Sequence, residues 1–158
     1  MNRVFRFVIA VVTLVVASAA TPSNDRLTSL NYLLGTWTCS YHALGAPVSS
    51  YSATYSYDVS GNWLKEVDTF SGGGDVGFYT YDRKNRVWSF VVVDSSRATT
   101  IFRAADDGTD RHLWHSIYPD TSMTERTDKD SATQYSIHFM QTTKGKTTTS
   151  WDACKKRA

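Results

Sequence analysis

The stretch Leu33-Leu34-Gly35-Thr36-Trp37 marks the point at which the character of the sequence changes. Before it, leucines recur at helical spacing, which predicts a short helix over residues 25–34 with one apolar face. After it, Thr, Ser, Tyr, Val and Trp dominate, and turn residues recur at intervals typical of β-strands. Gly35 permits a sharp turn from helix to strand. Trp37 is large enough to close one end of a β-structure while its indole N–H finds a partner.

Residues 51–58 show the strand pattern most clearly, because Tyr and Ala alternate strictly with Ser, Thr and Asp. Such alternation predicts one buried face and one solvated face. The turn signals along the chain divide the rest into similar segments. The expected strands are residues 36–42, 51–58, 63–70, 76–81, 86–93, 99–104, 111–118, 122–127, 133–141 and 147–153.

Hairpin turns in this number predict an antiparallel meander. At this length a meander tends to close, because closure removes exposed strand edges. The sequence therefore predicts an all-β fold, an antiparallel up-and-down barrel of about ten strands with a short N-terminal helix. A two-sheet sandwich is the alternative.

The first twenty residues have the pattern of an export signal. Arg3 and Arg6 precede an uncharged apolar run over residues 7–16, and small residues follow at 17–20. This three-part arrangement is typical of a cleavable secretory signal, and the alternative is an uncleaved membrane anchor. We expect residues 1–20 to be removed and residues 21–158 to form one domain. The expected location is secreted or periplasmic, with no membrane association after cleavage.

The charge balance gives no sign of a polyanionic partner. The full chain has 17 Lys and Arg against 15 Asp and Glu. Arg3 and Arg6 account for the whole excess, so the processed chain is formally neutral. Nucleic acid is not an expected partner.

The two cysteines, Cys39 and Cys154, lie near opposite ends of the processed chain. An even number of cysteines in an exported protein favours a disulfide, and the alternative is two free thiols. A Cys39–Cys154 bridge would join the first and last strands if these strands are neighbours.

Three short mid-chain motifs accompany the Leu-x-Gly-x-Trp box of residues 33–37. They are Tyr81-Asp82, Val87-Trp88-Ser89-Phe90 and Asp94-Ser95. With these motifs the chain resembles a bacterial family of lipocalin-like domains of no established function. More distantly it is similar to nitrobindin-like and lipocalin barrels of the calycin group. The resemblance covers most of residues 26–154 and implies a lipocalin-like barrel that holds a small apolar or amphipathic ligand.

Candidate ligand-binding residues follow from this resemblance and from the wealth of aromatic side chains, which make up 13% of the chain. Ordinary core packing also needs aromatic residues. Arg97 and Arg103 could hold a ligand carboxylate if their side chains point into the barrel. The candidates are Trp37, Tyr55, Trp88, Arg103, Trp114 and His138.

His138 is the one residue that corresponds to the haem-binding His of nitrobindin-like barrels, so a haem held by His138 is an alternative to a protein without cofactor. Its strand face also carries Gln134, Ser136 and Met140, and this face lines either a cavity or the solvent. No metal site is expected, because His112 and His115 point to opposite faces of a strand.

No nucleophile motif of a known enzyme class occurs in the sequence. Glu66 and Asp68 share one strand face, which would suit acid–base chemistry, but solvated acids are commoner. The leading prediction is non-catalytic binding of a small molecule. The alternatives are an enzyme or haem protein that uses His138, and an envelope interaction module with a filled barrel.

Overall fold

One short helix and ten antiparallel strands make up the computed structural model, which describes residues 25–106, 112–119 and 122–158. The elements are η1 (Asp25–Leu33), β1 (Gly35–Ala43), β2 (Ser49–Tyr57), β3 (Leu64–Phe70), β4 (Gly73–Asp82), β5 (Val87–Asp94), β6 (Thr99–Ala105), β7 (His112–Tyr118), β8 (Met123–Lys129), β9 (Gln134–Thr143) and β10 (Lys146–Lys156). The expected signal peptide, residues 1–20, lies outside the described residues. Within the described ranges, the structure holds no helix with the length and hydrophobicity of a membrane-spanning segment.

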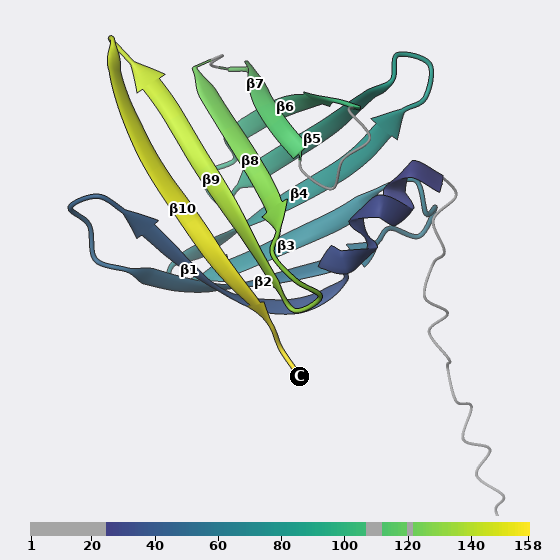
Figure 1. Ribbon diagram of the computed structural model, residues 1–158, viewed down its shortest axis with the longest axis horizontal. Helices are drawn as coiled ribbons and strands as arrows, with labels where there is room; N and C mark the ends of the chain where they lie inside the picture. The colour runs from purple at the N-terminus through teal and green to yellow at the C-terminus, as the bar shows by residue number, and fades with distance from the viewer. Residues whose placement is uncertain (1–24, 107–111, 120–121) are drawn as a thin grey trace, which may run out of the picture.

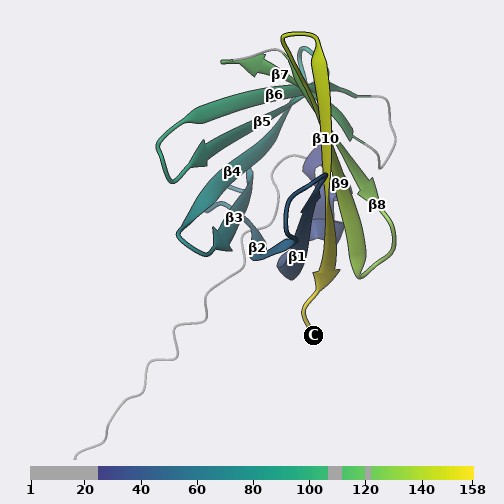
Figure 2. The same ribbon diagram turned by 90° about the vertical axis from the view of Figure 1, so that its left-hand side faces the viewer.

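The ten strands close into a barrel. Each strand pairs with its neighbours in the sequence, and β1 pairs with β10 to complete the ring. Figures 1 and 2 show the strands curving around a common interior, with η1 at one end. The predicted antiparallel up-and-down barrel with a short N-terminal helix is thus confirmed, and the sandwich alternative is wrong.

Alternating burial along each strand separates the inside of the barrel from the outside. On β2, Ala53 and Tyr55 are buried, whereas Thr54 and Ser56 are exposed. This is the pattern that the alternating residues of this segment predict. It recurs over parts of the other strands, so that one set of side chains faces the interior.

A disulfide joins Cys39 to Cys154, as the sequence predicts. The two residues are direct partners in the register between β1 and β10, and both side chains are buried. The bridge therefore lies inside the barrel at the place where its first and last strands meet.

The helix η1 closes one end of the barrel with three leucines. Leu27, Leu30 and Leu33 are at most 2% exposed. Their spacing of three residues matches the repeat of a 3-10 helix, which is the form that η1 takes. Gly35 follows with a φ of 108°, a backbone conformation that glycine adopts readily and other residues avoid.

Trp37 follows this turn by two residues on β1 and is fully buried. Its indole N–H donates a hydrogen bond to the carbonyl of Leu33. The side chain thus ties the first strand to the last turn of η1 and fills the closed end of the barrel.

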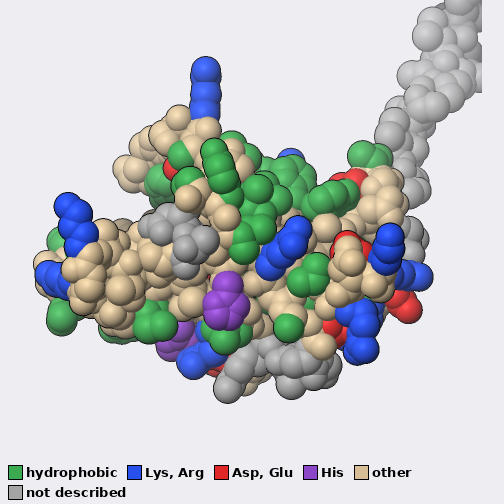
Figure 3. All heavy atoms as spheres, turned by 90° about the horizontal axis from the view of Figure 1, so that it is seen from above, with side chains coloured by type: hydrophobic (Ala, Val, Ile, Leu, Met, Phe, Trp, Pro, Cys, Tyr) green, Lys and Arg blue, Asp and Glu red, His purple; other side chains and the backbone are tan. Residues whose placement is uncertain are grey.

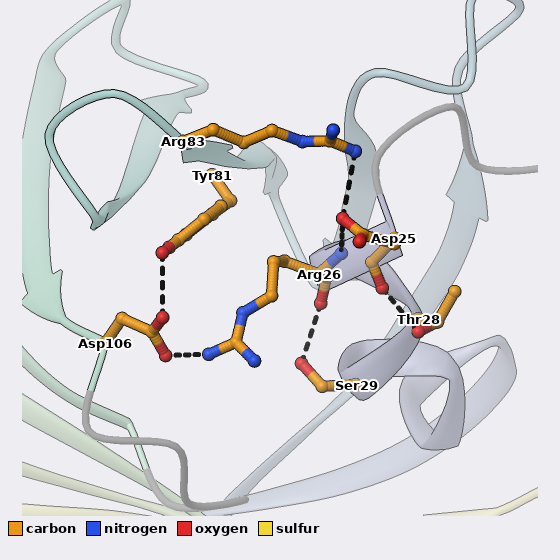
Figure 4. A network of polar contacts seen from close by, with 7 residues as sticks. All are labelled: Asp25, Arg26, Thr28, Ser29, Tyr81, Arg83 and Asp106. Carbon is orange, nitrogen blue, oxygen red and sulfur yellow. Dashed lines mark hydrogen bonds and ion pairs between the residues drawn. The ribbon is translucent and has the colours of Figure 1, made fainter.

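Polar contacts fasten η1 to the barrel wall (Figure 4). Arg26 forms an ion pair with Asp106, which follows β6, and Asp106 also accepts a hydrogen bond of 2.7 Å from Tyr81 on β4. Arg83, in the turn after β4, donates to Asp25 over 2.9 Å. These contacts fix the position of the helix over its end of the barrel.

Candidate functional site

The half of the barrel away from η1 contains a cavity of about 660 Å³. Figure 1 shows that η1 lies at one end of the barrel, whereas the β1–β2 loop and the tip of the β9–β10 hairpin lie at the other. The cavity reaches this second end, because Ser49 at the start of β2 and Ser71 in the β3–β4 turn are among its lining residues. Its volume is within the range of small-molecule sites.

Aromatic rings form much of the cavity wall. Tyr79 on β4 stacks on Phe90 of β5 with ring centroids 3.9 Å apart, and Phe90 stacks on Phe102 of β6 at 5.6 Å. Ile137 and Phe139 of β9 add further apolar surface. Such walls favour the apolar part of a ligand, because its burial removes nonpolar surface from water.

Five carboxyl groups also line the cavity, and we call them the carboxyl cluster. They are Glu66, Asp68, Asp75, Glu125 and Asp152. They come from β3, β4, β8 and β10, so the closure of the barrel brings them together. On the outer face seen in Figure 3, by contrast, Lys and Arg side chains stand out at both ends, and Asp and Glu show mainly on the right.

Tyrosine hydroxyls satisfy part of the carboxyl cluster. Tyr55 and Tyr79 both donate hydrogen bonds to Glu66, the latter over 2.6 Å. Tyr51 donates to Oδ2 of Asp152 over 2.8 Å. Glu66 is thus held by two phenols deep in the barrel, while Asp152 is held by one.

Burial raises the pKa of every member of the carboxyl cluster. Desolvation is the main cause, since it penalises the charged form, and neighbouring carboxylates add to it for Glu66, Asp68 and Glu125. The pKa of Glu125 rises to about 8, and that of Asp152 to about 6. Glu125 is therefore mostly protonated at neutral pH.

Several carboxylate oxygens of the cluster have no hydrogen-bond partner. The Oδ1 atoms of Asp68, Asp75 and Asp152 are buried and unpaired. In the described part of the chain, no ion pair joins a basic side chain to any of the five acids. The cavity thus offers carboxyl oxygens that are free to take part in hydrogen bonds with a ligand.

Four of the candidate residues predicted from the sequence lie inside the barrel but outside the cavity lining. Trp37, Tyr55, Trp88 and Trp114 are at most 3% exposed. They fill the interior between the cavity and η1. Tyr55 contacts two lining residues, Glu66 through a hydrogen bond and Tyr79 through ring packing. Trp37, Trp88 and Trp114 therefore lie in the packed core, which was the alternative to ligand binding for these aromatic residues.

Arg103 and His138 lie on the outer face of their strands. Arg103 is exposed because its neighbours Phe102 and Ala104 take the inner face of β6. The side chain of His138 is 45% exposed, and its Nε2 lies 3.9 Å from Asp128. Arg103 thus does not meet the condition of pointing into the barrel, and of the two alternatives for the face of His138 the structure shows the solvent-facing one. Arg97 lies in the β5–β6 turn.

A haem held by His138 does not fit this arrangement. His138 faces away from the interior, and the described cavity lining contains no His. His112 does face inward, but it packs against Trp88 and Trp114 outside the cavity lining. Among the described residues, no group of three or more His, Cys, Asp or Glu is arranged to hold a metal ion.

Sequence reasoning found only part of the carboxyl cluster. Glu66 and Asp68 were expected to share a face, and they do. Asp75, Glu125 and Asp152 were missed. Each of the three is in step with the buried residues of its strand, so its side chain lies on the inner face. The sequence reveals this position only once the buried face of each strand is known.

Comparison with known proteins supports the fold alone. No protein-family model and no curated protein matches the chain. Its structure is similar to that of a protein of unknown function from the DUF3598 family of Nostoc punctiforme PCC 73102, with a TM-score of 0.53 and 14% identity. The likeness covers 82% of this chain and 49% of the other, so this chain spans about half the length of that protein. A redesigned β-barrel is also similar, at a TM-score of 0.35 and 14% identity, over 82% of this chain and 96% of that chain.

The fold and the site together define a class, a closed ten-stranded β-barrel with an internal cavity at the end opposite its helix.

Proposed function

We propose that the protein binds an amphipathic small molecule in its barrel and catalyses no reaction. The cavity of about 660 Å³ carries this proposal, because it combines aromatic and aliphatic walls with a few buried polar groups. Ligand sites in proteins typically have this composition. We further propose that the chain is a lipocalin-like member of the calycin group, on the basis of its barrel, its helix and the box at residues 33–37.

A neutral fluorescent probe tests the binding proposal. Nile red is apolar and uncharged, and its emission rises in a dry cavity. We expect the wild-type protein to bind it saturably. Val92 lines the cavity, so Val92→Trp places an indole ring in the space that the probe would occupy. We expect the Kd for Nile red to rise by roughly tenfold or more, and a tenfold change corresponds to about 1.4 kcal/mol.

The matched control is Val93→Trp on the same strand. Val93 is 38% exposed and faces outward, so this variant should bind Nile red as the wild type does. Equal loss in both variants would contradict binding inside the barrel. Failure of the wild type to bind Nile red or any smaller amphipathic probe would contradict the proposed function and would favour an interaction module.

We also propose that the protein is exported and processed near residue 20, because residues 1–20 have the composition of a secretory signal. The Cys39–Cys154 disulfide is in keeping with an oxidising compartment. N-terminal sequencing of protein from the culture medium and envelope fraction should find a chain that begins near Thr21. A mature protein that retains Met1 would contradict this.

A further inference from the structure

In the described lining of the cavity, the ionisable carboxyl groups have no basic side chain among them. This described lining includes the five acids of the carboxyl cluster and no Lys, Arg or His. Like charges that share a low-dielectric space repel one another strongly. Asp68 and Asp75 are even direct partners in the register between β3 and β4, an arrangement that is unfavourable for strand pairing when both are ionised.

Asp152 provides a second, independent observation. Asp152 is only 4% exposed, and it is one of the residues that line the cavity. Oδ2 accepts the hydrogen bond from Tyr51, whereas Oδ1 has no partner. A buried carboxylate oxygen without a donor is unfavourable unless a ligand supplies one.

The apolar wall lies in the same cavity as these acceptors. The stacked rings of Tyr79, Phe90 and Phe102 belong to its lining together with Asp68 and Asp152. A ligand that satisfies both features carries an N–H donor with positive charge at one place and an apolar body at another. Aromatic faces also attract a nearby cation.

We propose that the ligand is an organic ammonium ion, a protonated amine on an aromatic or aliphatic body, whose N–H groups donate to Asp152 and Asp68. This inference rests on the proposed function and specifies its ligand class. The ammonium supplies the missing donors and offsets the repulsion within the carboxyl cluster. The body of the ligand packs on the Tyr79–Phe90 wall.

Proton release is a direct consequence of this binding mode. Burial holds the pKa of Asp68 and Asp152 above the ordinary range, so part of these carboxyl groups carry a proton in the empty barrel. An ammonium ion favours the ionised form, and the carboxyl O–H then gives its proton to the buffer. The affinity for an amine should accordingly rise between pH 5 and pH 8, as long as the amine itself remains protonated.

Two probes with the same apolar body and different end groups separate the contribution of the ammonium charge to binding from that of the apolar contacts. Tryptamine carries an ammonium group, and tryptophol carries a hydroxyl in its place. Isothermal titration calorimetry at pH 7 should show tryptamine binding at least about tenfold more tightly than tryptophol. In buffers of different ionisation enthalpy, the apparent enthalpy for tryptamine should change with the buffer, whereas that for tryptophol should not.

Asp152→Asn removes the charge and keeps the shape and the acceptor for Tyr51. The variant should lose most of the preference for tryptamine over tryptophol and should bind tryptophol as the wild type does. Asp68→Asn should act in the same direction. Asp130→Asn removes one acid from an exposed turn and should leave the preference unchanged.

The outcomes distinguish this inference from the proposed function. If Nile red binds but tryptamine shows no advantage over tryptophol, the barrel is a ligand carrier and the ammonium inference is wrong. The same holds if Nile red binds and both indole probes fail. If neither Nile red nor the indole probes bind, the proposed function itself fails.

Discussion

Gly77 shows how closely the cavity wall is built around a buried acid. A Cβ atom at this position would lie 2.7 Å from the ring of Phe90 and 2.9 Å from Oε2 of Glu66. Gly77 is also the register partner of Glu66 across β3 and β4. The absence of a side chain thus makes room for both a ring and a carboxyl group.

Glu125 leads to a prediction about pH. Its pKa is about 8 in the folded protein against an ordinary value of 4.5, because it is buried. Between these values the folded state retains a proton that the unfolded state has lost. The free energy of unfolding should therefore fall as pH rises from 5 to 8, by up to about 1.4 kcal/mol per pH unit for one such group.

Glu125→Gln removes this group from the titration. Urea denaturation at pH 5 and pH 8 should show a decrease in unfolding free energy that is smaller than in the wild type by roughly 1–3 kcal/mol. The control is Asp130→Asn, which changes an exposed acid and should follow the wild type. Identical pH profiles for wild type and Glu125→Gln would show that Glu125 is ionised in the folded state.

At the scale of elements, η1 acts as a plug whose three leucines belong to the main core cluster. Leu30 is 1% exposed. Leu30→Ala should lower the free energy of unfolding by about 2–4 kcal/mol, since it leaves a cavity beneath the helix. Thermal or urea denaturation measures the change.

The matched control for the plug is Leu113→Ala. Leu113 is 49% exposed on the outer face of β7, so its truncation should change stability by no more than about 0.5 kcal/mol. If Leu30→Ala cost as little as Leu113→Ala, η1 would be peripheral to the core rather than its lid.

The strand β9 illustrates what a sequence can and cannot predict about such elements. Alternation identified the strand and the two sets of residues on its faces. It did not say which set points inward, because Ser136 and His138 could have lined a polar cavity as well as faced water. Closure of the barrel settled this, with Tyr135 and Ile137 buried inside.

For the whole barrel, the helix, the ten strands, their order and the disulfide were predictable, because turns and alternation are local signals and hairpins pair neighbours. The cavity was not, because it depends on which inner side chains are large. Trp37, Trp88 and Trp114 fill one half, and smaller or polar side chains leave the other half open. That difference emerges only when residues from all strands are placed around one axis.

The disulfide gives a prediction at the scale of the whole molecule. Cys39 and Cys154 are 115 residues apart in the sequence, so the bridge restricts the unfolded chain strongly. Replacing both with Ala should lower the free energy of unfolding by about 2–5 kcal/mol. Wild-type protein treated with a reductant should unfold at a similarly lowered urea concentration. Unchanged stability in the double variant would show that β1 and β10 hold the barrel closed without the bridge.

The same bridge also determines how the folded chain responds to a pulling force. Cys39 and Cys154 face each other across the seam of the barrel, so tension applied to the chain before residue 39 and after residue 154 passes through two sulfur atoms. Once η1 has been pulled away from the barrel wall, the strands from β2 to β9 carry almost none of this load. Stretched in this direction, the molecule would release only η1, the start of β1 and the end of β10, and the cavity would keep its shape until a reducing agent cut the seam.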